Sequence, residues 1–262
     1  MCGPTREAVV KRGLDIALSI AGLIATFPVL AIAAFVIWLQ DFRSPFYIAQ
    51  RVGQAGAPFR MFKLRSMVAN ADRTGVDSTS RTDVRLTPVG SVVRKLKLDE
   101  IPQLFNVLRG EMTLVGPRPN VERETRLYTT EERRLLSVRP GITDISSIVF
   151  ADLGDILSDS GNANLDYSQL VRPWKSRLGL LYVDHASFWL DLKLIILTVL
   201  GVFWRSATLS ILARLARSMG ADGTLCVVIR REKPLAPAPP PGRDEIVSEA
   251  EVLRDAVVKV GV

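Results

Sequence analysis

The sequence is poor in the residues that build metal and disulfide scaffolds. Its 262 residues include one histidine, His185, and two cysteines, Cys2 and Cys226, which lie at opposite ends of the chain. The single histidine excludes a multi-histidine zinc site, and we interpret it as an ordinary surface or packed residue. The cysteines have neither metal-site spacing nor a disulfide framework, a usage typical of a reducing compartment. No internal repeat is present, so a repeat architecture is not expected.

Acidic residues are fewer than basic ones, 27 against 34, which gives a formal net charge of +7 and an isoelectric point of about 9.7. This excess predicts an anionic partner, whether a membrane surface, a nucleic acid or a phosphorylated substrate. Apolar residues make up 48% of the chain and the mean hydropathy is +0.21, which is high for a soluble protein. A membrane segment is therefore expected.

The longest apolar run is residues 16–39, where 24 consecutive positions carry no charge. As a helix this run is about 36 Å long, enough to cross a bilayer core of about 30 Å. Pro28 lies at its middle and breaks the helical hydrogen-bond ladder. Basic residues flank both ends, and the positive-inside rule keeps such ends on the cytoplasmic side. They are Arg6, Lys11 and Arg12 before the run, and Arg43, Arg51, Arg60, Lys63 and Arg65 after it.

These features predict a re-entrant helix, which enters the membrane, bends at Pro28 and returns to the same side. A kinked spanning helix is the main alternative, because proline is tolerated in such helices. A cleaved signal peptide is a second alternative, since Ala31-Ile32-Ala33 has the form of a cleavage site, although the apolar run continues past it.

A basic segment follows the apolar run. Residues 43–73 contain six basic residues and one acidic residue. Within it, residues 60–65 (RMFKLR) are typical of a half-buried strand with its bases on one face. Such a face, which includes Lys63 and Arg65, suits phosphates or lipid head groups, and a solvated charged face is the alternative.

The central stretch, residues 94–119, places two carboxylates among cations. Asp99 and Glu100 are adjacent at the predicted start of a short helix that ends at Gly110. Unpaired backbone N–H groups and the helix dipole favour ionised carboxylates there, as a nucleophile or a metal ligand requires. Lysines precede the pair and Arg118 follows it in a GPRP turn, so we predict a site for a phosphorylated substrate and a divalent metal. Asp99 as a simple N-cap is the alternative.

Two helices are expected around this pair. Thr87 as N-cap and Pro88 at the first helical position predict a helix over residues 88–98. The helix after the pair has one apolar face, because its large apolar residues follow the i, i+3, i+4, i+7 rule. These residues are Ile101, Leu104, Phe105 and Leu108.

The later segments are less distinctive. Residues 144–166 contain five aspartates and no base but lack calcium-loop spacing, so a solvated loop is predicted. Residues 186–204 are apolar, yet Asp191 and Lys193 leave only 11 uninterrupted residues, too few to span a bilayer. Helices lying in the membrane interface suit this stretch, and a core helix followed by a surface helix is the alternative.

Residues 234–242 (PLAPAPPPG) predict a stiff linker.

In order along the chain, five segments resemble the bacterial sugar transferases. This family contains monotopic membrane enzymes that move a phosphosugar from a nucleotide diphosphosugar to a polyprenyl phosphate. The resemblance covers about residues 10–200 and departs after RPGIT, where the chain continues Asp144-Ile145-Ser146. The segments are KRGLD (11–15) before the apolar run, FKLRSM (62–67), residues 86–119, RPGIT (139–143) and SFWLDLK (187–193).

The resemblance implies roles for single residues. Asp99 would be the nucleophile and Glu100 its partner and first protein ligand of a Mg²⁺ ion. The phosphate-binding residues would be Lys63, Arg65, Arg94, Arg118 and Arg139. A carboxylate nucleophile divides the transfer into two displacements through an acyl phosphate. The donor would be a UDP-sugar and the acceptor undecaprenyl phosphate, in the first membrane step of a glycan or exopolysaccharide pathway on the cytoplasmic face of the bacterial inner membrane.

We therefore predict an α/β fold that is mostly helical with a small sheet. A re-entrant N-terminal helix (1–44) would precede a cytoplasmic transferase domain with interfacial helices (45–220) and a Pro-rich flexible tail (221–262). One rival is a membrane-tethered basic nucleic-acid-binding protein, although no helix-turn-helix, RNP or OB signature is present. Another is an inactive scaffold of a glycan assembly complex. The sequence leaves open the sugar, the prenyl chain length and whether the protein forms a homo-oligomer.

Overall fold

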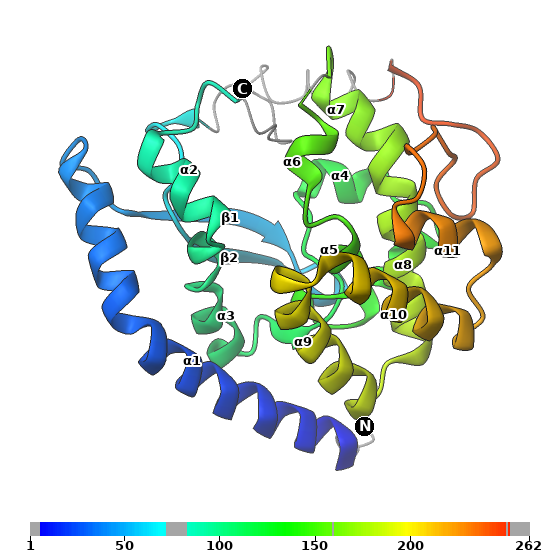
Figure 1. Ribbon diagram of the computed structural model, residues 1–262, viewed down its shortest axis with the longest axis horizontal. Coiled ribbons are helices and arrows are strands. Elements are labelled where there is room, and N and C mark those ends of the chain that lie inside the picture. The colour runs from blue at the N-terminus through cyan, green and yellow to red at the C-terminus, as the bar shows by residue number, and fades with distance from the viewer. Residues whose placement is uncertain (1–5, 72–82, 159, 250, 252–262) are drawn as a thin grey trace.

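The structure, a computed structural model, describes residues 6–71, 83–158, 160–249 and 251. Within these residues the protein is mostly helical with two small sheets and one long apolar N-terminal helix, which confirms the predicted class (Figure 1). The helices are α1 (Arg6–Leu39), α2 (Pro88–Lys95), α3 (Gln103–Arg109), α4 (Glu122–Arg126), α5 (Ile145–Val149), α6 (Leu153–Ile156), α7 (Ala163–Asp166), α8 (Arg172–His185), α9 (Phe188–Phe203), α10 (Arg205–Ser218) and α11 (Gly223–Arg230). The strands are β1 (Phe46–Val52), β2 (Pro58–Leu64), β3 (Thr113–Val115) and β4 (Gly141–Thr143), and the short helical turns are η1 (Gln54–Gly56), η3 (Leu98–Glu100), η4 (Glu132–Ser137) and η5 (Tyr167–Val171).

Helix α1 is bent. Figure 1 shows its axis changing direction part-way along. Pro28 lies inside the helix and supplies no N–H to the ladder, and the Thr26 hydroxyl donates to the Gly22 carbonyl at 2.6 Å, two features that favour bending. Its segment Glu7–Leu39 is long and apolar enough to cross a membrane, and little of it is buried in the protein. The predicted return of the chain to the same membrane face stays a prediction.

The first turns of α1 are bonded to the rest of the protein by polar groups. Lys11 forms an ion pair with Asp191 of α9 at 2.6 Å. Arg12 donates to two backbone carbonyls at the C-terminal end of α3 at 2.6 and 2.9 Å, where such carbonyls lack helical partners. Asp15 accepts hydrogen bonds from the first two residues of β3 at 2.7 and 3.1 Å. These contacts fix the apolar helix to the domain at its N-terminal half.

Strands β1 and β2 form an antiparallel hairpin, and β2 confirms the predicted strand. Because side chains alternate along a strand, Lys63 lies on the same face as the buried Met61. Arg60 is exposed on the opposite face, so the prediction that the bases share one face is wrong. The three-residue spacing from Arg60 to Lys63 cannot stay on one side of a strand.

The parallel pair β3–β4 brings two loops together. A Cβ atom on Gly141 would lie 2.1 Å from the backbone nitrogen of Gly116, so this close approach requires glycine. The GPRP turn (116–119) and the RPGIT segment (139–143) are consequently neighbours, although 19 residues separate them in the sequence.

Helices α2 and α3 follow the sequence signals at their ends. Thr87 accepts a hydrogen bond from the Gly90 nitrogen at 2.9 Å and Pro88 begins α2, as predicted, but the helix ends at Lys95 and not at Leu98. Gly110 ends α3 in the left-handed conformation, with φ of +81°, also as predicted.

The apolar face predicted for α3 is not its most buried face. Phe105 is 53% exposed, whereas Gln103, Asn106 and Val107 are fully buried. The Asn106 side chain accepts from the Phe62 nitrogen at 2.9 Å and donates to the Arg60 carbonyl of β2 at 2.7 Å. These hydrogen bonds turn the polar face toward β2 and leave the apolar face toward α1 and the surface.

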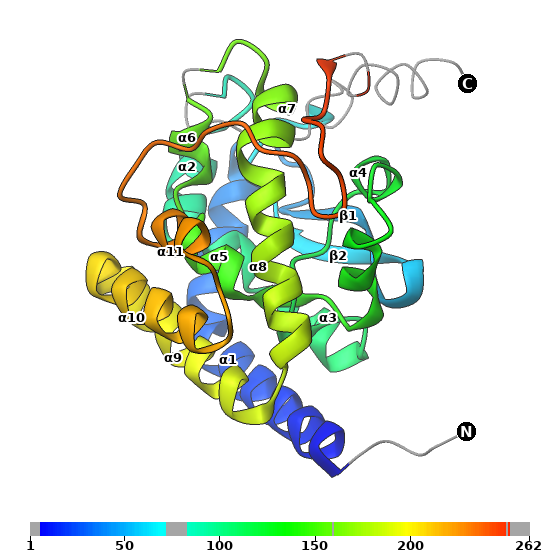
Figure 2. The same cartoon turned by 90° about the vertical axis from the view of Figure 1, so that its right-hand side faces the viewer.

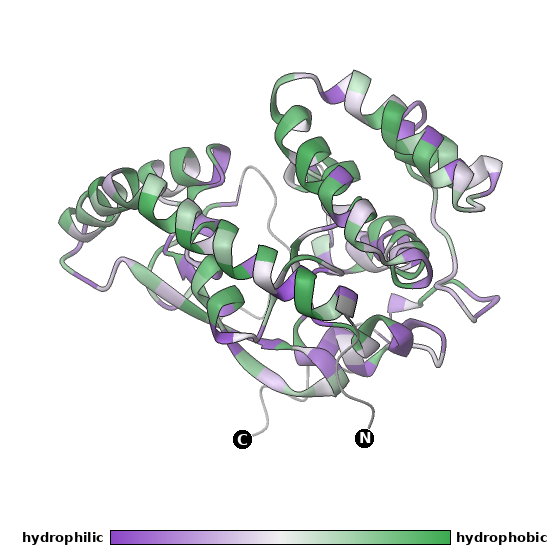
Figure 3. Ribbon diagram, turned by 90° about the horizontal axis from the view of Figure 1, so that it is seen from below, coloured by the Kyte–Doolittle hydropathy of each residue, from purple (hydrophilic) through white to green (hydrophobic). Residues whose placement is uncertain are grey.

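The main hydrophobic core lies among α5, α8, α9, α10 and α11. One face of α9 enters it through Leu190, Leu194 and Leu197, and the opposite face is exposed and apolar. Hydrophobic residues predominate along both α1 and α9 when the molecule is seen from below (Figure 3). The exposed large side chains of α9 and its C-cap are Trp189, Ile196, Val199, Val202, Phe203 and Trp204. The stretch is therefore partly buried in the core and partly exposed, and its location in the membrane interface stays a prediction.

Two segments differ from expectation. The aspartate-rich segment 144–166 folds into α5, α6 and α7, and Asp144 is almost fully buried as the N-cap of α5, so the solvated-loop prediction is wrong for it. Helix α11 packs into the main core, although a flexible tail is predicted from residue 221.

The chain after α11 returns along the protein as far as the structure describes it, and Figure 2 shows it crossing the N-terminal end of α8. Ala238 donates its backbone N–H to the Gln169 carbonyl at 3.0 Å, and the Gln169 side chain donates to the Val247 carbonyl at 2.8 Å. The Pro-rich segment 234–242 is extended, as predicted, but it is held against the domain. We call residues 232–249 the C-terminal strap. Residues 252–262, part of the predicted tail, lie outside the described residues.

Candidate active site

The adjacent carboxylates lie in the turn η3, between α2 and α3. Lys97 adopts the left-handed conformation, with φ of +58°, and redirects the chain after α2. Asp99 is 5% exposed and Glu100 is half-buried. Pro102 occupies the N-cap position of α3, so the alternative interpretation of Asp99 as a helix cap is wrong. A buried carboxylate with no capping role calls for another explanation.

Glu100 is paired and Asp99 is not. Both terminal nitrogens of Arg118 bond to the Glu100 carboxylate, and the same guanidinium donates to the Ile142 carbonyl at 3.1 Å. This bidentate pair fixes the orientation of Arg118 in the loop after β3. No hydrogen bond to the Asp99 side chain is found among the described residues, and the charges that act on it are Glu100 and three cations.

The electrostatics separate the two carboxylates. Burial, followed by the charge of Glu100, raises the pKa of Asp99 above its usual range, against the opposing effect of the cations Lys63, Arg94 and Arg118. For Glu100, burial by itself would raise the pKa, but Arg118 and Lys63 outweigh it and lower the pKa to about 2. Two neighbouring carboxyl groups with opposite pKa shifts are typical of different roles in one reaction.

Lys63 completes the cluster from β2. Burial, followed by repulsion from Arg118, lowers the pKa of its ammonium group to about 8, and the two carboxylates oppose this shift. The ammonium group is therefore charged at neutral pH and becomes neutral in mildly alkaline solution. An anion that binds between Lys63 and Arg118 would be attracted by two fixed positive charges at low solvent exposure.

The structure brings together five of the seven predicted site residues. They are Asp99, Glu100, Lys63, Arg94 and Arg118. Arg65 instead forms a two-pronged ion pair with Asp41, just after α1, with both N–O distances at 2.6 Å. Arg139 is exposed, and it is not among the groups that perturb either carboxylate. Their predicted phosphate contacts stay predictions.

Sequence reasoning missed Lys175, which lies on α8. Burial, followed by Arg118, lowers the pKa of its ammonium group, and Asp144 opposes the shift, so these three charged groups lie close together. Nothing in the local pattern around Lys175 distinguishes it from any other helical lysine, because its neighbours in space are 31 and 57 residues away in sequence.

The carboxylate oxygens of the site suit a hard cation that is bound by the protein and by a substrate together. Among the described residues, there is no group of three or more His, Cys, Asp or Glu side chains that could hold a metal ion by itself. Mg²⁺ is commonly bound by one or two carboxylates together with substrate phosphates. Asp99 and Glu100 provide such carboxylates beside cations that would attract phosphate. The site therefore fits Mg²⁺ brought in with a phosphorylated substrate.

Comparison with known proteins gives consistent matches. The model of the family "Bacterial sugar transferase" matches residues 6–205. A UDP-N-acetylgalactosamine-undecaprenyl-phosphate N-acetylgalactosaminephosphotransferase of Aeromonas hydrophila is 31% identical over 199 residues, which are 73% of this chain and 43% of the relative. The exopolysaccharide production protein ExoY of Sinorhizobium fredii is 34% identical over 209 residues, 74% of this chain and 85% of the relative.

A third relative is the UDP-glucose:undecaprenyl-phosphate glucose-1-phosphate transferase of Caulobacter vibrioides, 34% identical over 208 residues, which are 75% of this chain and 72% of the relative. The chain thus spans less than half the length of the Aeromonas relative but most of the other two. The matched region contains all seven predicted site residues and ends before α11 and the C-terminal strap.

Proposed function

The chain belongs to the bacterial sugar transferase family, and from that premise we propose that it transfers a sugar 1-phosphate from a nucleotide diphosphosugar to a polyprenyl phosphate. The observation that carries the proposal is the buried, unpaired Asp99 beside the Glu100–Arg118 pair and two further cations. The printed names of two relatives support a UDP-sugar as donor and undecaprenyl phosphate as acceptor. The identity of the sugar is left to experiment.

In the first displacement, an Asp99 carboxylate oxygen attacks the phosphorus that carries the sugar. The bond from this phosphorus to the bridging oxygen breaks, and its electron pair stays on the departing nucleoside monophosphate. An acyl phosphate forms on Asp99. The raised pKa of Asp99 supports this role, because a more basic carboxylate is a better nucleophile, while the nearby cations favour its ionised form.

In the second displacement, a phosphate oxygen of the polyprenyl phosphate attacks the same phosphorus. The bond to the Asp99 oxygen breaks and the carboxylate is regenerated, with no net change in the enzyme. Dividing the transfer in this way lets a water-soluble donor and a lipid acceptor use one site in turn. Arg118 and Lys63 would bind the phosphoryl oxygens in both steps, since arginine matches them with two parallel hydrogen bonds.

Glu100 is the first residue we assign to Mg²⁺, together with phosphate oxygens of the donor. When bound, Mg²⁺ would supply positive charge to offset the negative charge of the pyrophosphate. The pKa of Glu100, lowered to about 2, keeps this carboxylate ionised at any physiological pH, as a ligand must be. Removal of divalent ions with EDTA should therefore stop turnover, and restoring Mg²⁺ should recover it.

We also propose that α1 is re-entrant and that the catalytic domain lies on the cytoplasmic face. Support comes from the bases at both ends of the apolar run and from Pro28 within the helix. Both halves of α1 pack on the same domain: Arg12 bonds α3, and Ile37 packs in a small core with Leu64 and Val93. A straight spanning helix would carry one of these halves away from the domain.

The experiment is a UMP-release assay with the purified full chain in detergent, Mg²⁺, undecaprenyl phosphate and a panel of UDP-sugars. Multiple-turnover release of UMP that depends on the acceptor, with one or a few preferred sugars, is the expected result. It would also separate an enzyme from an inactive scaffold. No release above background with any donor would overturn the proposed function.

A further inference from the structure

An open apolar groove lies between the C-terminal half of α1 and helix α2, which are neighbours in Figure 1. Its cavity volume is about 230 Å³. An apolar cavity of about 150 Å³ is enough to bind benzene, so the groove has room for at least one isoprene unit, which is of similar size. As far as the described residues define it, no polar or charged side chain lines the groove. Its walls include Val29, Ile32, Ala33 and Val36 from α1, and Val92 and Val93 from α2.

The wall from α1 is one stripe of the helix, distinct from the aromatic side chains of the same half. The four wall positions are spaced i, i+3, i+4 and i+7 and begin directly after Pro28. Phe35 and Trp38 are exposed, stack on each other and do not line the groove. Valine and isoleucine are stiff at χ1, and the small Ala33 side chain leaves the space between them open. The groove is therefore preformed, which lowers the entropic cost of binding a chain in it.

The groove adjoins the candidate active site along the backbone. Leu98 is a wall of the groove and directly precedes Asp99 in η3, so their Cα atoms are about 3.8 Å apart. Val93 is a wall as well and directly precedes Arg94, one of the cations that act on Asp99. Val93 and Leu98 pack together in the small core that also contains Ile37 of α1. The same two elements thus present apolar side chains to the groove and charged side chains to the site.

The dimensions and the place of the groove select its occupant. Its α1 wall belongs to a segment apolar and long enough to cross a membrane, so an apolar chain from the bilayer can reach it. A helix of a second copy is about 10 Å wide and is too large for a cavity of this volume. In a phospholipid, glycerol and an ester group separate the phosphate from the acyl chains. In a polyprenyl phosphate the phosphate is bonded directly to the first isoprene unit, which matches a groove whose wall is one residue from Asp99.

We propose that the groove between α1 and α2 binds the first isoprene units of the polyprenyl phosphate acceptor, with the phosphate directed toward Arg94 and Asp99. The assignment rests on the proposed function, because it takes the acceptor from that reaction. A chain that leaves the bilayer for the groove passes from one apolar medium to another, so little hydrophobic free energy is gained. The groove acts instead by orientation, since it holds the phosphate near the phosphorus that it attacks in the second displacement.

The first test compares Ala33→Phe with Ala31→Phe in the purified full chain in detergent. Both changes add the same ring to the uncharged run of α1, but Ala33 is a wall of the groove, whereas Ala31 is exposed and is not a wall. The donor half of the reaction is measured as the burst of UMP without acceptor. The acceptor half is measured as the KM for undecaprenyl phosphate at saturating donor. Val92→Phe, which fills the groove from α2, is the second variant in case Ala33→Phe does not fold.

We expect Ala33→Phe to raise the KM for undecaprenyl phosphate at least about tenfold, because the ring occupies the space of an isoprene unit, and to leave the UMP burst within twofold of the wild type. Val92→Phe should behave in the same way, and Ala31→Phe should stay within twofold in both measurements. An unchanged KM for undecaprenyl phosphate in both groove variants, or an equal rise in Ala31→Phe, would overturn the inference while the proposed function stands.

The second test needs no turnover. An undecaprenyl phosphate analogue with a diazirine on its second isoprene unit is irradiated with the wild-type protein in the absence of donor. We expect labelled peptides from residues 29–36 and 89–98, competition by undecaprenyl phosphate but not by phosphatidylglycerol, and loss of the label in Ala33→Phe. Labelling elsewhere, or equal competition by phosphatidylglycerol, would make the groove a site for ordinary bilayer lipid and overturn the inference. Absence of UMP release by the wild type with any donor would overturn the proposed function, and the labelling would then decide the lipid site by itself.

Discussion

Two glutamate–arginine pairs of the domain differ in their burial and in their hydrogen bonding. In the Glu132–Arg172 pair the side chains are 0% and 2% exposed, and the carboxylate has four hydrogen bonds. In the Glu100–Arg118 pair both side chains are more than 20% exposed. The first pair is closed and neutral. The second is open, and an unpaired carboxylate and two more cations adjoin it.

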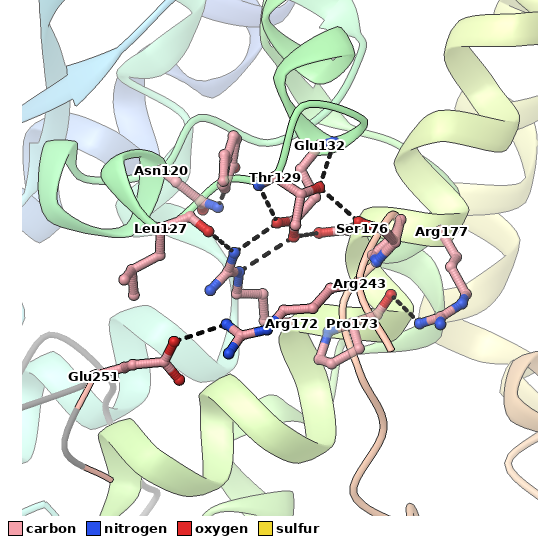
Figure 4. Close-up of polar contacts among 12 residues, drawn as sticks. Asn120, Leu127, Thr129, Glu132, Arg172, Pro173, Ser176, Arg177, Arg243 and Glu251 are labelled. Atoms are coloured by element: carbon pink, nitrogen blue, oxygen red, sulfur yellow. Dashed lines mark hydrogen bonds and ion pairs between the residues drawn. The ribbon is translucent and has the colours of Figure 1, made fainter. Parts of the chain in front are cut away.

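The difference separates an ion pair that stabilises the fold from one that lies beside the candidate reactive groups. A buried ion pair whose carboxylate is fully hydrogen-bonded (Figure 4) holds the surrounding elements in place, and removal of the carboxylate leaves a lone buried charge. An ion pair beside an unpaired buried carboxylate leaves a negative charge that a metal or a cationic group can neutralise, and such groups are typical of functional sites. We therefore assign a structural role to Glu132 and a chemical role to Glu100 and Asp99.

Asp99→Asn should have the largest effect on activity, a loss of about a thousandfold or more in turnover, as expected when a nucleophile is removed. The amide is isosteric and uncharged, so the fold should survive and the thermal midpoint should stay equal or rise. UMP release and circular dichroism of the detergent-purified variant measure the two quantities. Turnover near the wild-type rate would show that Asp99 is not the nucleophile.

Glu132→Ala should have the largest effect on stability. It leaves Arg172 buried without a counter-charge, which typically costs about 3–5 kcal/mol of unfolding free energy. The matched control is Glu122→Ala, which breaks the exposed Glu122–Arg126 pair and should cost no more than about 0.5 kcal/mol. Chemical denaturation in one detergent compares the variants, and equal losses would contradict the distinction between closed and exposed pairs.

Activity should fall as the pH rises through about 8. Burial and Arg118 lower the pKa of Lys63 to about 8, so its ammonium group is charged below that pH and neutral above it. Loss of this charge removes attraction for phosphate, and turnover with subsaturating donor should drop about tenfold between pH 7 and pH 9 as the neutral form becomes about nine-tenths of the population. Lys63→Arg, which stays charged, should retain activity at pH 9. An identical pH profile in this variant would assign the decline to another group.

Thr129→Val should have the smallest effect, because it deletes only two hydrogen bonds just before η4: the one that the Thr129 hydroxyl donates to the C-terminal strap and the one that it accepts from the Glu132 nitrogen. Such a bond contributes about 1 kcal/mol to stability. We expect a slightly lower thermal midpoint and a donor KM raised by about threefold at most, with kcat unchanged. A large loss in kcat would mean that the strap acts on the chemical step and not only on stability.

The sequence predicted those features that local chemistry determines. Thr87 and Gly110 mark helix ends through capping, and the residue pattern of 60–65 marks a strand. Asp99, Glu100 and Arg118 lie within 20 consecutive residues, so their association needed only a turn and one strand to form. The bases Lys11 and Arg12 were interpreted as topology signals, whereas their side chains bond α9 and α3.

The remaining features depend on contacts that the local sequence does not encode. Glu132 and Arg172 are 40 residues apart, and nothing around either residue indicates a buried charge. The burial of Asn106 was missed for a similar reason: its partners are backbone groups of β2, and an apolar face on the same helix suggested the opposite orientation.

The proposed two-step mechanism requires a covalent intermediate at Asp99. The purified protein should be mixed with Mg²⁺ and the UDP-sugar that supports turnover, without polyprenyl phosphate, quenched in acid and digested for mass spectrometry. We predict one equivalent of UMP per active enzyme and a peptide containing Asp99 that gains the mass of the sugar phosphate, both absent in Asp99→Asn. Addition of undecaprenyl phosphate before the quench should discharge the adduct. UMP that forms only when the acceptor is present, with no adduct on Asp99 at any time, would contradict the two-step mechanism.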